Sequence, residues 1–153
     1  MNLLVGIDTE GDNQWDAAAR ANQQFENIYA LPRLHALFAK HGVRPTYVVT
    51  YPVVRDARSA EVLGRLLAAG DCEIGAHHHA WETPPCSQED VHRHPYASTL
   101  PRSQFEAQLA SLTGAIAAAV GFLLYCVRHE ESFGKQFALS ISESDMLKRA
   151  DQI

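Results

Sequence analysis

The chain has 153 residues and a formal net charge of −5, with thirteen Lys and Arg against eighteen Asp and Glu. This is the length of one domain or of part of a larger one, and 46% apolar residues can supply a buried core. The chain has no long basic stretch and no long apolar span, so we expect neither a nucleic-acid nor a membrane partner. Because it shows no export signal and has an odd number of cysteines, we expect a cytoplasmic location.

Short apolar runs alternate with helical patterns along the first 127 residues. In chain order, the expected elements are a strand at 3–7, a helix from Leu31 to His41, a strand at 46–50, a helix capped by Ser59 that runs to Gly70, a strand at 72–76, a helix at 103–120 and a strand at 122–127. Strands that alternate with helices predict a parallel sheet with crossover helices, which is an α/β fold.

Two segments depart from this alternation. The polar stretch at 86–101 is longer than an ordinary connection, which is typical of a functional loop. After Val127 the periodicity weakens, and only a helix near residues 144–150 is indicated.

Two clusters of metal-ligating residue types follow predicted strands. The clusters are Asp8, Glu10 and Asp12 after the first strand, and His77, His78 and His79 after the third. Parallel strands end at the same edge of their sheet, and working residues of α/β proteins gather there. Carboxylates and imidazoles that meet at one edge are ligands for a divalent metal such as zinc.

Side-chain alternation divides these clusters further. In an extended segment His77 and His79 point to one side and His78 to the other, and Asp8 shares a side with Glu10. One carboxylate can therefore bind metal while the other moves protons. Each cluster alone has an ordinary explanation, a solvated acidic loop or a surface histidine run. The coincidence of both at equivalent strand ends favours a metal site.

Three segments carry a family resemblance: Val5–Asp12, Arg44–Val49 and Gly70–His77. Together they resemble the polysaccharide deacetylase family, the NodB-type homology domain of carbohydrate esterase family 4. The resemblance extends over residues 3–122. It implies a partial (β/α) barrel and a hydrolase that removes N- or O-acetyl groups from a carbohydrate with a divalent metal, usually zinc.

The resemblance also implies residue roles. Asp8 matches the catalytic base of the first motif, and Glu10 matches its metal ligand in a variant where one residue separates the two. His77 matches the first histidine ligand. The family's second histidine normally lies four residues further on, where this chain has Trp81, so a shortened His-x-His-x-Trp form makes His79 the second ligand.

Several alternatives stay open at this level. Asp12 could replace either acidic residue, and His78 could replace an assigned histidine. The family's later motifs find no good match, so we expect residues 1–121 to be the N-terminal part of the domain and 122–153 an atypical tail, with the domain truncated there.

The chain is then either an active hydrolase or one that keeps its metal ligands without turnover. A non-enzymatic metal or carbohydrate binding module and a different metal-dependent amidohydrolase are the competing functions, and the oligomeric state is open.

Overall fold

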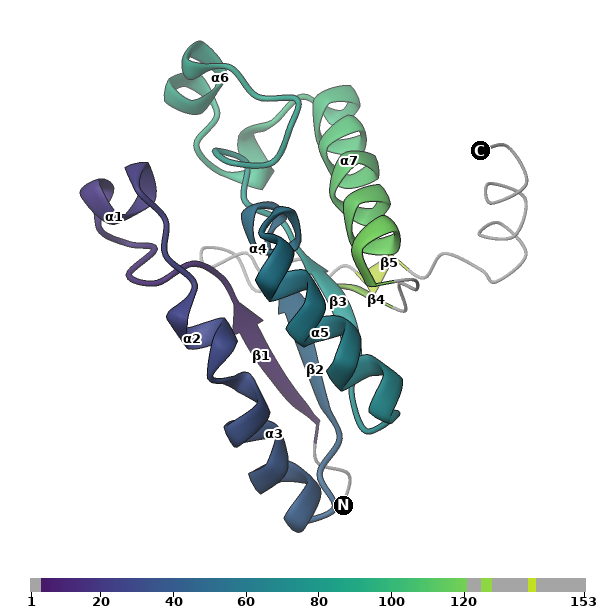
Figure 1. The fold of residues 1–153 in the computed structure, drawn as a ribbon. Helices are drawn as coiled ribbons and strands as arrows, with labels where there is room; N and C mark the ends of the chain where they lie inside the picture. The colour runs from purple at the N-terminus through teal and green to yellow at the C-terminus, as the bar shows by residue number, and fades with distance from the viewer. Residues whose placement is uncertain (1–3, 121–124, 128–137, 140–153) are drawn as a thin grey trace.

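The computed structural model describes residues 4–120, 125–127 and 138–139. Its strands form one sheet in the order β1-β2-β3-β4-β5 (Figure 1). The strands are β1 (Val5–Thr9), β2 (Pro45–Val49), β3 (Glu73–His77), β4 (Tyr125–Val127) and β5 (Ala138–Leu139). Strands β1 to β4 run parallel, and β5 is antiparallel to β4. The predicted parallel α/β arrangement is thus confirmed, whereas the described strands form a sheet that does not close into a barrel.

Helices connect the strands. They are α1 (Ala17–Ala21), α2 (Glu26–Tyr29), α3 (Leu31–Lys40), α4 (Tyr51–Arg55), α5 (Ala57–Ala69), α6 (Gln88–Arg93) and α7 (Arg102–Val120), with a 3-10 turn, η1 (Ala97–Thr99), before α7. Among the described residues, no helix combines the length and apolar character that crossing a bilayer requires.

Three predicted boundaries need correction. Strand β1 continues to Thr9 because Asp8 and Thr9 still pair with β2, so the acidic cluster begins inside the strand. Helix α5 is capped by Asp56, whose carboxylate accepts a 2.7 Å hydrogen bond from the Ser59 backbone N–H, so the predicted Ser59 cap is wrong. The polar segment 86–101 contains α6 and η1. The helix expected near 144–150 lies outside the described residues.

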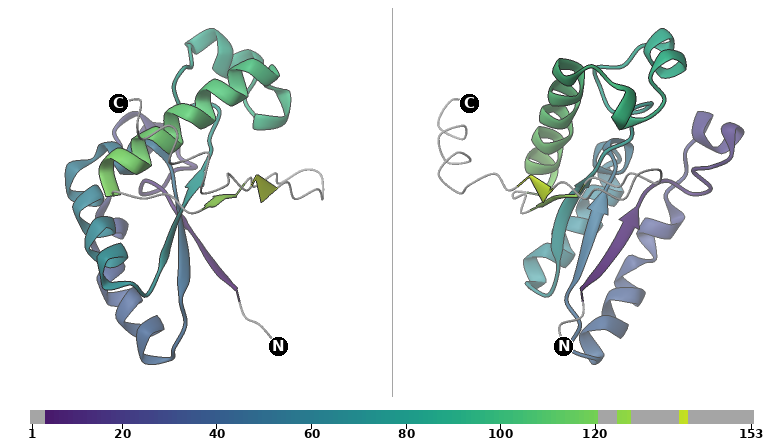
Figure 2. Two further views of the ribbon diagram at one scale, coloured as in Figure 1. Left: turned by 90° about the vertical axis from the view of Figure 1, so that its right-hand side faces the viewer. Right: turned by 180° about the vertical axis from the view of Figure 1, so that it is seen from behind.

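The core lies between the sheet and its helices. Alternate side chains of β2 and β3 point toward α5 and α7, including Tyr47 and Val49 at 0% exposure and Ile74 at 1%. Helix α7 contributes Leu112 and Ile116, both at 0%. Figure 2 shows α3 and α5 together on one side of the sheet. We call this side the helix face.

The opposite side of the sheet, which we call the site face, is polar at its carboxyl end. Ile7 packs against the core, so its neighbours Gly6 and Asp8 in β1 point to the site face. In β3, Ile74 and Ala76 belong to the core, which leaves His77 on the site face. The same strands therefore place core side chains on the helix face and candidate functional side chains on the site face.

Candidate metal centre

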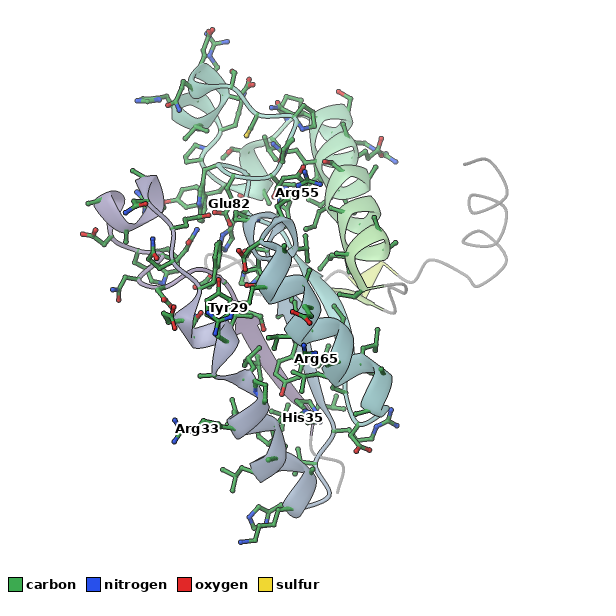
Figure 3. All side chains as sticks on the ribbon, in the orientation of Figure 1. Tyr29, Arg33, His35, Arg55, Arg65 and Glu82 are labelled. Atoms are coloured by element: carbon green, nitrogen blue, oxygen red, sulfur yellow. The ribbon has the colours of Figure 1, made fainter. Side chains whose placement is uncertain are left out.

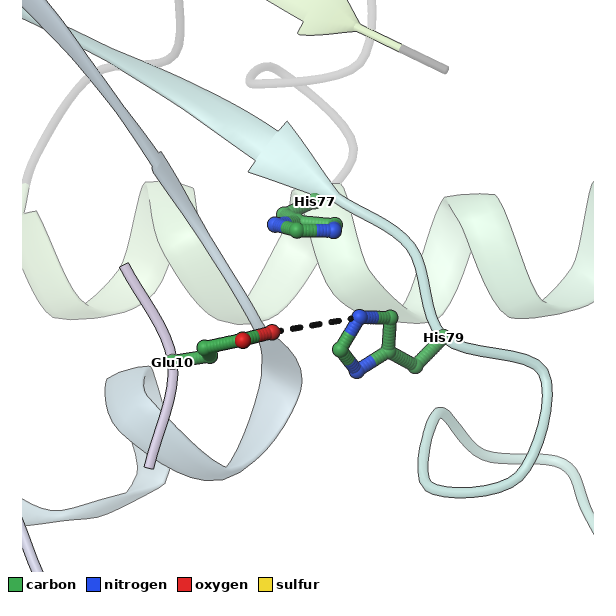
Figure 4. A group of neighbouring side chains, drawn as sticks. All are labelled: Glu10, His77 and His79. Carbon is green, nitrogen blue, oxygen red and sulfur yellow. Dashed lines mark ion pairs between the residues drawn. The ribbon is translucent and has the colours of Figure 1, made fainter. Parts of the chain in front are cut away.

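Three side chains from two strand ends converge on the site face. Glu10 directly follows β1, His77 is the last residue of β3, and His79 lies two residues further on. Strands β1 and β3 flank β2 in parallel, so their carboxyl ends lie at the same edge. Each residue offers one ligand atom, and these atoms all lie within 4.8 Å of one another (Figure 4). This group could hold a metal ion.

The geometry of the group fits a small divalent ion. The Nε2 atom of His79 lies 3.3 Å from Oε2 of Glu10, and the two imidazole rings meet edge to face with centroids 4.5 Å apart. Zinc bonds of about 2 Å in tetrahedral geometry hold their donors about 3 to 3.5 Å apart. One donor pair is therefore already at a coordinating separation. Carboxylate and imidazole donors suit zinc and several other divalent ions.

The three side chains of the group are largely buried. The side chains of His77 and His79 are 9% and 7% exposed, and that of Glu10 is 18% exposed. Polar groups removed from water lose hydration that their new neighbours must replace. A cation bound between them would add to the contacts that these side chains already make.

Asp8 lies beside the group rather than inside it. Its Oδ1 atom is 3.7 Å from Nδ1 of His77, and its side chain is 52% exposed. The carboxylate is therefore both close to a candidate ligand and open to solvent. Its assignment as catalytic base stays a prediction, which this position suits.

His78 points away from the group, as side-chain alternation predicts. Its Nε2 atom is 2.7 Å from Oε1 of Gln108 in α7, and its ring meets the edge of Phe105. The Gln108 amide nitrogen donates to the carbonyls of Ala80 and Pro85, so its oxygen is left to accept from His78. The structure therefore does not bring His78 into the candidate site.

Asp12, the acidic alternative, has a structural role. Its two carboxylate oxygens accept hydrogen bonds from the backbone N–H groups of Glu26 and Asn27, at 2.9 and 3.1 Å, in the first turn of α2. The Asn27 side chain in turn donates to the carbonyl of Glu10 at 2.9 Å. Asp12 thus helps to hold the segment that carries Glu10, and it does not join the ligand group.

A carboxylate that sequence reasoning missed lies next to His79. The Oε1 atom of Glu82 is 2.8 Å from Nδ1 of His79. The other oxygen of Glu82 accepts hydrogen bonds from the side-chain amides of Gln14 at 2.6 Å and Gln23 at 3.1 Å. The three-residue spacing of His79 and Glu82 was a usable signal in the sequence, because a turn brings such residues together. The glutamines gave none.

Aromatic side chains border the group. Trp81 stacks on His79 with ring centroids 4.3 Å apart, and Trp15 follows at 6.4 Å from Trp81. Trp15 is 68% exposed. A row of aromatic rings thus leads from the surface to a candidate ligand.

Comparisons of the chain with protein-family models, curated proteins and solved structures found no match.

Proposed function

We propose that this chain is a metal-dependent hydrolase that removes acetyl groups from a polysaccharide or an amino sugar. The observation that carries the proposal is the convergence of Glu10, His77 and His79 from two strand ends, with Asp8 beside them. Catalytic zinc sites typically have three protein ligands and one open position, and an accessible carboxylate can serve as the general base. We infer the substrate class from the motif resemblance of residues 3–122 to the polysaccharide deacetylases, and the geometry of the site does not define it.

Three of the four residues would bind the metal, and the fourth would transfer a proton. Glu10, His77 and His79 would hold the ion, with zinc as the expected metal. Bound zinc would lower the pKa of a water molecule and polarise the acetyl carbonyl. Asp8 accepts a proton from the attacking water and can return it to the sugar nitrogen or oxygen as the acetyl bond breaks. Water and the acetylated sugar are consumed, and acetate and the free amine or hydroxyl are released.

The exposed indole of Trp15 supports a ring-shaped substrate. Large aromatic surfaces contribute to binding by burying area against the apolar face of a ligand. Trp15 and Trp81 provide such surfaces on the approach to His79. A sugar ring seated on these indoles would lie close to His79.

Acetate release from an acetylated amino-sugar oligomer, measured with and without added zinc, tests the proposal. Asp8→Asn removes the proton acceptor and keeps the size of the side chain, so we expect zinc binding to persist while turnover falls by about 10²- to 10⁴-fold. His77→Ala should lose both zinc binding and turnover. Glu89→Gln is the matched control, because Glu89 lies in an exposed pair with Arg93 on α6.

The outcomes separate the candidate functions. Zinc-dependent acetate release that Asp8→Asn abolishes supports the hydrolase. Zinc binding without acetate release contradicts it and favours a metal or carbohydrate binding module. An absence of zinc binding in the wild-type chain rejects both.

A further inference from the structure

The turn that follows β3 brings the carboxylate of Glu82 into contact with His79. The backbone N–H groups of Glu82 and Thr83 donate to the carbonyl of His79, at 3.4 and 3.0 Å. This turn carries the Glu82 side chain, 10% exposed, back against the imidazole. Figure 3 shows Glu82 at the end of the sheet where the strands finish.

The contact between Glu82 and His79 determines where the imidazole carries its proton. An ionised carboxylate can only accept hydrogen bonds. Because Oε1 of Glu82 lies 2.8 Å from Nδ1 of His79, Nδ1 must carry the hydrogen. In the neutral ring the lone pair is then on Nε2, the atom 3.3 Å from Glu10. Nε2 is also the atom that can bind a metal shared with Glu10.

Two glutamines prevent Glu82 from turning away. Gln14 and Gln23 both donate to Oε2 of Glu82, while Oε1 accepts from His79. Gln14 is 3% exposed, and Arg20 donates to its carbonyl at 3.2 Å. Both glutamines belong to the segment between β1 and α2, the same segment that follows Glu10. The hydrogen bonds from Gln14 and Gln23 to Glu82 therefore link the two segments that supply the ligands.

We propose that Glu82, held by Gln14 and Gln23, is a positioning residue that fixes the Nδ1-protonated form of His79 and so presents Nε2 to a divalent cation. This inference rests on the metal site of the proposed function. Glu82 acts through His79 and does not itself contact the ion. Carboxylates in this position fix ring orientation and raise ligand basicity, and their loss typically weakens metal binding by about 10- to 100-fold.

The test uses the 153-residue chain and two variants of Glu82. Calorimetric titration with zinc should show binding weakened by about 10- to 100-fold in Glu82→Ala. In Glu82→Gln the amide oxygen can still accept from Nδ1, but the amide nitrogen cannot accept from Gln14 and Gln23, so part of the affinity should return. The double variant Gln14→Ala/Gln23→Ala should weaken binding less than Glu82→Ala. Glu89→Ala, which removes an exposed carboxylate, should bind zinc as the wild type does.

A second readout needs no metal. Nitrogen-15 NMR of the metal-free chain at alkaline pH reports which ring nitrogen of His79 is protonated. We expect Nδ1 in the wild type and in Glu82→Gln, and a mixture in Glu82→Ala. Circular dichroism identifies any variant that fails to fold.

The two readouts separate failure of this inference from failure of the proposed function. Wild-type zinc affinity in Glu82→Ala, or an unchanged His79 ring in that variant, would overturn the role of Glu82. A purely structural role would weaken binding without changing the ring, and Glu82→Gln would not recover it. If the wild-type chain binds no zinc, the metal site fails, while the ring measurement still decides what Glu82 does.

Discussion

The two faces of the sheet use the same strands for different purposes. On β3, Ile74 and Ala76 point to the helix face and are 1% exposed, whereas His77 points to the site face. A strand alternates its side chains, so one short segment can serve the core and the site together. The face on which a residue lies, more than the strand that carries it, therefore determines whether its loss changes stability or chemistry.

The largest effect should come from the helix face. Ile74→Ala removes a side chain at 1% exposure and leaves a cavity against α5 and α7, so the free energy of unfolding should fall by about 2 to 5 kcal/mol. Urea denaturation of the metal-free protein measures this. If the variant remains folded, its zinc affinity should change little. A large loss of zinc affinity without a loss of stability would contradict the separation of the two faces.

His77→Ala tests the site face of the same strand. Zinc at 100 times its dissociation constant should stabilise the wild-type chain by about 2.7 kcal/mol, because the ion binds the folded state. The variant should show almost none of this gain. Thermal melts with and without zinc give the difference, and a zinc-induced shift as large as that of the wild type would place the metal elsewhere.

Tyr47 and His35 show that the helix face also holds a buried polar pair. The Tyr47 hydroxyl lies 3.2 Å from Nδ1 of His35, which Figure 3 places between α3 and the sheet. Burial, with a smaller contribution from Cys72, raises the pKa of Tyr47 to about 12. The unfolded value is about 10, so this stabilisation is complete below pH 10 and is lost as the pH rises toward 12.

Tyr47→Phe should therefore flatten the fall in stability between pH 10 and 12. At neutral pH the variant should lose about 1 kcal/mol with the hydrogen bond to His35. Urea denaturation across this range measures the slope. Burial also raises the pKa of Cys72 to about 11, so part of the alkaline decline should persist in the variant. An unchanged slope above pH 10 would show that Tyr47 does not cause it.

The candidate ligands could be predicted because simple periodicity governs them. Glu10 and His77 lie at the ends of short apolar runs that alternate with helical patterns, which favours parallel strands, and the ends of parallel strands bring the following side chains to one edge of the sheet. Alternation was also enough to separate His79 from His78. The order of the strands along the chain and the two-residue alternation of their side chains therefore predict most of the candidate site.

The hydrogen bonds from Gln14 and Gln23 to Glu82 could not be predicted in the same way. Gln14 and Gln23 lie in a segment whose only regular element is the short helix α1, so no period relates them to Glu82. Their approach depends on tertiary contacts. The start of α5 was missed for another reason, because Asp56 and Ser59 are both favourable helix caps and only the backbone path chooses between them.

Asp56 also gives a small expected effect on stability. Asp56→Ala removes the cap of α5 and should lower the free energy of unfolding by about 1 kcal/mol. Burial alone would raise the pKa of Asp56, but hydrogen bonds from Ser59 and Tyr29 outweigh it and lower the pKa. The ionised form therefore contributes stability above pH of about 4, and this is lost as the pH falls.

Asp56→Asn separates the cap from the charge. Asparagine caps helices about as well as aspartate, so the variant should keep most of its neutral-pH stability while losing part of the acid dependence. Urea denaturation at neutral pH and near pH 3 measures both quantities. Zinc affinity should stay unchanged, because α5 packs on the helix face. An altered zinc affinity in either Asp56 variant would show that the two faces are coupled through the sheet.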